Sequence, residues 1–328
     1  MEADSVSSLR LNDRALKLVE ETLLRDPSRF RVHVSAVPGG GRLVDAGVSA
    51  PGGLEAGLLL ARVCLADLGR VSLEAAGESG AESLLASCPI VHVATDHPVA
   101  ACMASQYAGW QLSVEKFFGM GSGPFRAAYG KEALFDAIGH RENAEAVAGV
   151  LETSALPGPE VFRHVAERAR VPQGRVTLLA ARTKSLAGSV QIVARSVETA
   201  LHKLHHLRFD LARIVSARGS APLPPPARSD LAALGRTNDA VLYGGRVTLW
   251  VRGDDESLAS IGPQVPSESS RDFGAPFAEV FERYGRDFYK VDPGLFSPAE
   301  ITFQNLDTGR TQRFGRLDSS VLERSFFA

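Results

Sequence analysis

Apolar side chains recur at spacings of three and four along residues 183–207, which predicts one amphipathic helix. Its apolar stripe consists of Leu186, Val190, Val193, Val197, Leu201 and Leu204. The opposite stripe consists of Lys184, Gly188, Gln191, Arg195, Glu198 and His202. Arg195 and Glu198 are three residues apart, so their side chains share one face and can touch. One interpretation is a solvated ion pair worth ~0.2–0.5 kcal/mol. Because this face is flat at Gly188 and carries few charges of mixed sign, the other interpretation is that a ligand lies against it.

The same kind of pattern predicts the other elements of the chain. Further helices are expected over residues 11–26, 52–68, 95–112 and 277–288. Pro98 stands in the first turn of the third of these, where a proline is tolerated. Alternating segments predict strands over residues 70–76, 88–94 and 175–181, and hairpins over 30–48, 235–253 and 299–317. In the second hairpin the turn is expected at Gly244-Gly245.

One order of elements occurs twice along the chain. The segment from Val91 to Pro124 reads as a strand, a polar loop, a helix, a strand and a Gly-Ser-x-Pro turn. The segment from Val176 to Pro222 repeats this order. This predicts an α/β protein with some α+β character, in which two related α/β units with mixed sheets enclose a ligand cleft. The first domain is expected over residues 1–175 and the second over 176–328, and the chain can cross between them. The alternative to two related units is that the two segments resemble each other by chance.

Composition narrows the class of protein. The chain has 328 residues, of which 45% are hydrophobic, so it can bury a large core. A net charge of −2, without a basic block, does not indicate nucleic-acid binding. The sequence contains no run of 18 apolar residues, so no membrane span is predicted. Acidic residues near the start argue against a secretory signal. Three separated cysteines, Cys64, Cys88 and Cys102, are typical of reduced residues in a cytoplasmic protein.

Motifs for metals and nucleotides are weak in this sequence. HExxH, P-loop and GxSxG motifs are absent, and the run "GMGSGP" follows a predicted helix and strand instead of opening a dinucleotide-binding unit. His202, His205 and His206 lie near Glu198, which leaves a metal-dependent hydrolase as an alternative.

Several segments together resemble one family, the methenyltetrahydromethanopterin cyclohydrolases. They are, in order, "ATDHPVAACMASQYAGWQ", "MGSGP", "KSLAGSVQIVARSVETALHKL", "GRTNDAVLYGG", "VPSESSRDFGAPF" and "FYKVDPGLFSPAEI". The family occurs in methanogenic archaea and in methylotrophic and related bacteria. The resemblance implies a two-domain α/β subunit, a homotrimer, and neither a metal nor a redox cofactor.

The reaction that the resemblance implies is the reversible hydrolysis of N5,N10-methenyl-tetrahydromethanopterin, or its dephospho form, to the N5-formyl compound. It is a step of one-carbon metabolism such as formaldehyde oxidation. The family's catalytic arginine and glutamate match Arg195 and Glu198, within "VARSVETA". The flat face of the helix is then the wall against which the pterin lies, and Glu198 is the expected general base.

Other polar residues are candidates for binding the pterin substrate: Lys184, Ser185, Gln191, Asp96, Gln106, Tyr107, Ser122 and Asn238. For each, an ordinary helix cap, turn or solvated side chain is the alternative. Two other functions stay open: a non-catalytic pterin-binding protein, and another one-carbon enzyme on the same carrier, such as a formyltransferase or a methylene dehydrogenase.

Overall fold

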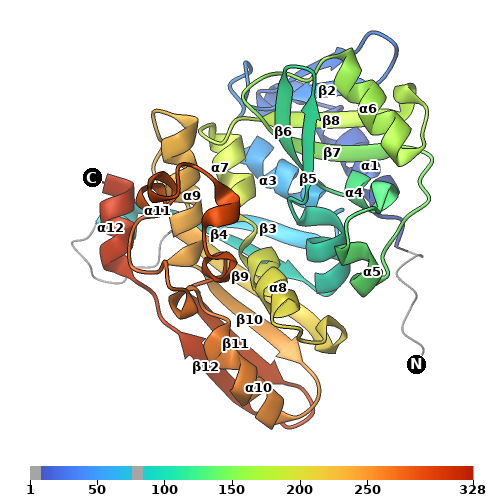
Figure 1. The fold of residues 1–328 in the computed structure, drawn as a ribbon. Coiled ribbons are helices and arrows are strands. Elements are labelled where there is room, and N and C mark those ends of the chain that lie inside the picture. Colours follow the sequence, from blue (N-terminus) through green and yellow to red (C-terminus); the bar gives the residue numbers. More distant parts are fainter. Residues whose placement is uncertain (1–8, 76–83, 328) are drawn as a thin grey trace. The chain divides into compact units, whose positions relative to one another are not determined.

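The computed structural model describes residues 9–75 and 84–327 (Figure 1). The chain forms two compact units. The first consists of Met1–Gly69 and Ala100–Gln191, and the second of Arg70–Val99 and Ile192–Ala328. The chain therefore passes from one unit to the other three times, and the predicted boundary at 175/176 falls inside the first unit. The expected ligand cleft stays a prediction.

The first unit is built on a mixed sheet whose described strands run in the order β1-β2-β8-β7-β6-β5. Their bounds are His33–Ala36, Arg42–Asp45, Val176–Ala181, Val147–Glu152, Phe117–Ser122 and Trp110–Val114. The central strands β2, β8 and β7 are parallel, and the others are antiparallel to their neighbours. The β1–β2 pair confirms the hairpin predicted over residues 30–48.

Helices cover both faces of this first sheet. One core lies against α1 (Leu11–Leu18), its π-helical continuation η2 (Val19–Leu23) and α3 (Leu54–Cys64). The other lies against α6 (Pro159–Ala169), with Phe125 of α4 (Phe125–Tyr129). Because neighbouring residues of a strand point to opposite faces, β7 contributes Ala148 and Val150 to the first core and Val147 and Leu151 to the second. The unit also contains α2 (Pro27–Phe30), η4 (Val99–Gln106), α5 (Leu134–Ile138) and α7 (Leu186–Val193).

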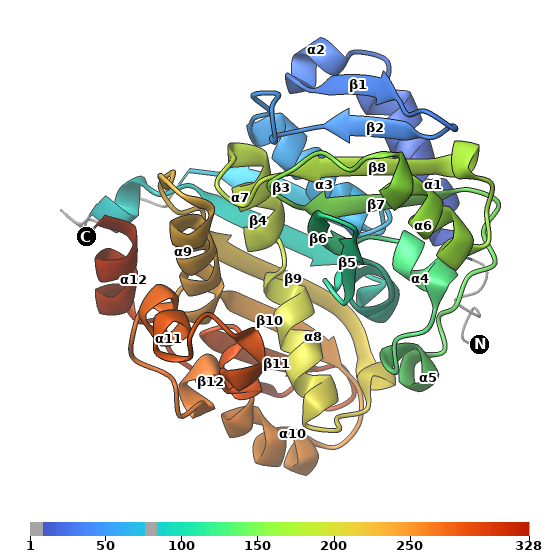
Figure 2. The ribbon, with the colours of Figure 1, turned by 45° about the horizontal axis from the view of Figure 1, so that its top comes forward.

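The second unit contains another mixed sheet, with described strands in the order β12-β11-β10-β9-β4-β3. Their bounds are Thr311–Gly315, Glu300–Asn305, Arg246–Val251, Ile214–Pro222, Ile90–Thr95 and Gly69–Glu74. Figure 2 shows α8 (Ser196–His206) lying across β9 and β10. A row of paired, buried residues crosses this sheet from β11 to β4, and it consists of Ile301, Val247, Gly219 and Val93. Together the two mixed sheets confirm the α/β fold class, and β11–β12 confirm the closing hairpin.

The hairpin predicted over residues 235–253 is wrong, because its first half is helical. Ser229 accepts a hydrogen bond from the Ala232 N–H and caps α9 (Asp230–Leu242), which precedes β10. Gly244 and Gly245 follow the end of this helix, where the Gly245 N–H bonds the Val241 carbonyl. The short helices α10 (Asp255–Ile261), α11 (Phe277–Arg283) and α12 (Ser319–Phe327) complete the unit, and the sequence pattern did not predict α10 or α12.

The proposed repeat also differs from its prediction. Each copy begins in one sheet and ends in the other: the first passes from β4 through η4 to β6, and the second from β8 through α7 and α8 to β9. The first Gly-Ser-x-Pro segment ends β6, as expected for a turn. The second, residues 219–222, lies within β9 and pairs with both β4 and β10.

Asp239 joins three helices of the second unit from a fully buried position on α9. Its carboxylate accepts hydrogen bonds from the Phe277 N–H at 2.8 Å and from the Ser325 hydroxyl at 2.6 Å, at the start of α11 and near the end of α12. Burial raises the pKa of Asp239 to about 7, although both hydrogen bonds oppose the shift. The native state therefore keeps this proton at pH values where the unfolded chain has lost it.

We predict that Asp239→Asn gains stability relative to the parent protein as the pH rises from 5 to 8. Because the folded pKa lies above the unfolded value of 3.8, the proton stabilises the folded protein at low pH, and that contribution is lost as the pH rises through about 7. The asparagine has no such proton, so the relative gain should exceed ~1 kcal/mol. Chemical denaturation at both pH values measures it, with Asp136→Asn, at an exposed carboxylate, as the control. An equal difference at the two pH values would contradict the prediction.

Candidate active site

The helix predicted over residues 183–207 is two helices. The first, α7, ends at Val193, and α8 begins at Ser196. Between them Arg195 has φ −94° and ψ 10°, in the bridge region of backbone conformations. The prediction of one helix is wrong here because neither glycine nor proline marks the break. As a consequence, Glu198 lies in the first turn of α8, where the helix dipole favours a negative charge.

Arg195 and Glu198 form the contact that their spacing predicts. Nε and Nη2 of Arg195 donate to Oε2 of Glu198 at 3.1 and 2.9 Å. The side chains are 15% and 3% exposed, so the interpretation as a solvated surface pair is wrong. Both hydrogen bonds fall on Oε2, and Oε1 accepts none from the residues that the structure describes. Nor is Oε1 one of the fully enclosed polar atoms that lack a hydrogen-bond partner, so part of its surface is open to solvent. One carboxylate oxygen is therefore anchored, and the other is available to water or a ligand.

His202 follows Glu198 by one turn of α8. Burial lowers the pKa of His202, and the nearby Glu198 charge only partly offsets this, so the imidazole is neutral at neutral pH. Within residues 9–75 and 84–327, no group of three or more His, Cys, Asp or Glu side chains is arranged to hold a metal ion. The metal-dependent alternative built on His202, His205 and His206 thus gains no geometric support.

A glycine of the central strand β9 sets the position of the first turn of α8. A Cβ atom at Gly219 would lie 2.3 Å from Oγ of Ser196 and 2.9 Å from Cγ2 of Val197. Real Cβ atoms do not approach so closely, so only glycine allows the helix to lie this near the strand. Ser196 and Val197 are fully buried and stand between Arg195 and Glu198 in sequence. Packing against Gly219 therefore holds the backbone between Arg195 and Glu198 in place.

Three predicted binding residues lie around α7 in the first unit. Lys184 is in the turn before the helix. The Ser185 hydroxyl accepts from the Gly188 N–H at 3.0 Å, which makes it the cap of α7. Gln191 is 3% exposed, and Sγ of Cys64 donates to its Oε1 at 3.8 Å. The side of the helix predicted to be polar and open is thus buried at Gln191.

Asp45 organises the loop beside this turn, and sequence reasoning missed it. Its carboxylate accepts the backbone N–H groups of four successive residues, Gly47, Val48, Ser49 and Ala50, at 2.7–3.1 Å. The loop packs so tightly on Ser185 that a Cβ at Gly47 would lie 2.4 Å from its Oγ. An aspartate directly before "AGVSAPGG" is the signal that could have revealed this loop.

Gln106, Tyr107 and Ser122 meet at the end of η4 in the first unit. Ser122 donates to the backbone carbonyl of Gln106, and both residues are buried. The Arg126 guanidinium lies 4.9 Å from the centre of the Tyr107 ring. Arg126 is fully buried, bonds Glu132 through two nitrogens, and donates to the carbonyls of residues 103 and 105. Sequence reasoning missed Arg126, which holds this end of the helix in place.

Asp96 and Asn238 belong to the second unit. Asp96 is exposed after β4 and accepts from the Ser216 hydroxyl at 2.7 Å. Asn238 is helical, and its amide donates to the Leu234 carbonyl one turn earlier at 2.8 Å. Asn238 therefore lies within α9 and not in a turn. Among the residues that the structure describes, no hydrogen bond joins Asp96 or Asn238 to Glu198, so their part in binding stays a prediction.

The fold and the site define an α/β protein with a buried guanidinium–carboxylate pair. Comparison with known proteins identifies the family within this class. The family model described as Cyclohydrolase (MCH) matches residues 10–326. A methenyltetrahydromethanopterin cyclohydrolase of Rhodopirellula baltica is 49% identical over 292 residues, covering 88% of this chain and 86% of the relative.

Two further relatives carry the same name. That of Methylobacterium sp. (strain 4-46) is 47% identical over 321 residues, which cover 96% of this chain and 97% of the relative. That of Methanococcoides burtonii is 38% identical over 320 residues, covering 97% and 98%. The chain therefore belongs to the cyclohydrolase (MCH) family, which confirms the resemblance. None of the described helices has both the length and the apolar character needed to cross a membrane.

We predict that Gly219→Ala lowers turnover at least ~10-fold, because the added methyl displaces the α8 turn that carries Glu198, and small displacements of reacting groups are costly. Ser220→Ala is the matched control, since the neighbouring residue of the same strand points to the other face of the sheet. Steady-state kinetics with circular dichroism separates lost activity from lost folding. Normal turnover in a folded Gly219→Ala protein would contradict the proposed packing constraint.

Proposed function

We propose that this protein hydrolyses N5,N10-methenyl-tetrahydromethanopterin, or its dephospho form, to the N5-formyl compound. The names of its relatives support this substrate. The structural observation that carries the chemistry is Glu198, a buried carboxylate with Oε2 anchored by Arg195 and with no hydrogen bond to Oε1 from the described residues.

The chemistry of the substrate explains the need for such a carboxylate. The methenyl carbon lies between two nitrogens and shares their positive charge, so it is electrophilic. A water oxygen bonds to this carbon while Oε1 of Glu198 accepts one of the water protons. The hydroxyl of this adduct then loses its proton as the bond between the carbon and N10 breaks, N10 gains a proton, and the carbon remains on N5 as a formyl group. The sum of these steps is addition of one water and release of one proton.

Arg195 has two roles in this proposal. Its two hydrogen bonds to a single oxygen fix the rotation of the Glu198 carboxylate, so that Oε1 keeps one direction. Its charge also offsets the cost of keeping a carboxylate in a site that is 3% exposed. Removal of the arginine therefore disturbs the base without removing it.

We also propose that the protein needs neither a redox cofactor nor a metal. Hydrolysis leaves the oxidation state of the one-carbon unit unchanged, so no electron carrier is consumed. The cationic methenyl carbon accepts water without a Lewis acid. Assembly as a homotrimer stays a prediction from family resemblance, which sedimentation equilibrium can test.

The first test is the near-ultraviolet absorbance of the methenyl substrate, followed in time with purified protein and without added metal or nucleotide. Loss of absorbance beyond the spontaneous rate supports hydrolysis. Binding without such loss, for both the phosphorylated and the dephospho carrier, would instead identify a non-catalytic pterin-binding protein.

We predict that Glu198→Gln lowers kcat by ~10²–10⁴-fold, the range that general base catalysis supplies, while substrate affinity changes little. Glutamine keeps the shape of the side chain but does not accept the proton from water. Glu282→Gln, at an exposed ion pair with Arg286, is the control. Turnover that survives in Glu198→Gln would retain the reaction and discard Glu198 as the base.

Arg195→Gln is expected to lower kcat as well, and the double variant with Glu198→Gln should cost about as much as Glu198→Gln alone. Residues that act as one unit show such non-additive losses, because the arginine has nothing to position once the base is absent. Stopped-flow or steady-state kinetics on the three variants measures this. Losses that multiply would show that Arg195 acts independently of Glu198.

A further inference from the structure

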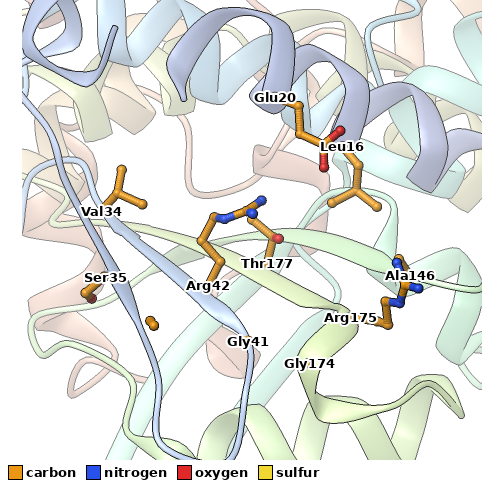
Figure 3. Close-up of a pocket in the computed structure, with 11 residues that line it drawn as sticks. Leu16, Glu20, Val34, Ser35, Gly41, Arg42, Ala146, Gly174, Arg175 and Thr177 are labelled. Carbon is orange, nitrogen blue, oxygen red and sulfur yellow. The ribbon is translucent and has the colours of Figure 1, made fainter. Parts of the chain in front are cut away.

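A cavity of about 330 Å³ in the first unit shares no lining residue with the candidate active site. It lies between the helix formed by α1 and η2 and the edge of the sheet at β1, β2 and the start of β8. In Figure 3, Leu16 and Glu20 point into it from the helix, and Arg42 and Thr177 line it from the strands. Arg175 lines it from the residues before β8.

The polar lining interrupts an otherwise apolar face of the sheet. Arg42 pairs with Thr177 across β2 and β8, and the row two residues further along these strands consists of Val44 and Leu179, both in the core under α1 and α3. Side chains two residues apart on a strand point to the same face. A guanidinium and a hydroxyl therefore stand where the pattern of the sheet would place aliphatic side chains.

The charges of this lining are not neutralised by the protein. The side chains of Arg42, Arg175 and Glu20 have no hydrogen-bond or ion-pair partner among the residues that the structure describes. Thr177 is 4% exposed, and within the same residues its hydroxyl also has no partner. Glu20 and Arg175 are exposed to solvent, whereas Arg42 is half-buried and Thr177 is buried. Buried polar groups normally find a hydrogen-bond partner, so a ligand would complete Thr177 and Arg42.

We propose that this cavity binds a small organic anion, a carboxylate or a phosphate ester, with an apolar part. Two guanidinium charges against one carboxylate leave a net charge of +1. The guanidinium groups match the oxygens of either anion, and Thr177 supplies a further donor. Leu16 and Val34 provide an apolar wall for the rest of the ligand. The proposal does not depend on the reaction at Glu198.

The test measures the melting temperature of the full-length protein with benzoate, phenyl phosphate or inorganic phosphate, each against chloride at matched ionic strength. Benzoate and phenyl phosphate share an apolar ring and differ in the anionic group, so they distinguish the two classes of ligand. Both the parent protein and Arg163→Gln, an exposed control on α6, should gain at least ~2 °C with one of the ring-bearing anions. In Arg42→Gln/Arg175→Gln that gain should fall by more than half.

Comparison between variants removes the general effect of anions, because phosphate also stabilises proteins by exclusion from their surface. An equal gain in the double variant would overturn the proposal, since the anion would then act elsewhere. No gain in the parent protein with any of the three anions would overturn it as well. If the double variant does not fold, Arg175→Gln alone, at an exposed residue, gives the same comparison.

Discussion

The close approach of α8 to the central strand β9 is the constraint on which the candidate site depends. Ser196 and Val197 press against the backbone of Gly219, where even a methyl group has no room. Because these two residues stand between Arg195 and Glu198, the packing that fixes them also fixes the direction of the ion pair. A glycine in the middle of a strand costs stability, and here the cost is offset by the placement of a charged turn against a buried sheet.

Other polar groups in the molecule serve the same purpose of holding backbone segments in place. Asp45 gathers four N–H groups of one loop, Asp239 links α9 to α11 and α12, and Arg126 ties the end of η4 to Glu132. Each is buried, and each satisfies donors or acceptors that regular secondary structure leaves open. Glu198 differs from them, because within residues 9–75 and 84–327 only one of its carboxylate oxygens accepts a hydrogen bond. A buried carboxylate that is half satisfied is suited to a proton transfer.

Much of the fold follows from local patterns. The β1–β2 hairpin, the β11–β12 hairpin, α3 and α11 lie where alternation or helical spacing predicts them. The errors arise where local signals conflict with packing. Residues 235–245 contain Asn, Asp and Gly, which favour turns, yet the cap at Ser229 and buried apolar residues such as Val241 make this segment helical. The break at Arg195 has no local signal at all.

For the site, the sequence by itself determined the family, the pairing of Arg195 with Glu198, and the buried apolar stripe from Val190 to Leu204, whereas Leu186, the first residue of that stripe, is exposed. The pairing and the stripe depend on residue type and on spacing of three or four, which are local properties, and the family follows from several segments in one order. Only the tertiary structure decided that the opposite stripe is also buried at Gln191 and Glu198, that Gly219 belongs to a strand, and that Oε1 is the open oxygen. Helical periodicity shows which side chains avoid water, but what covers the other face depends on segments far away in the chain.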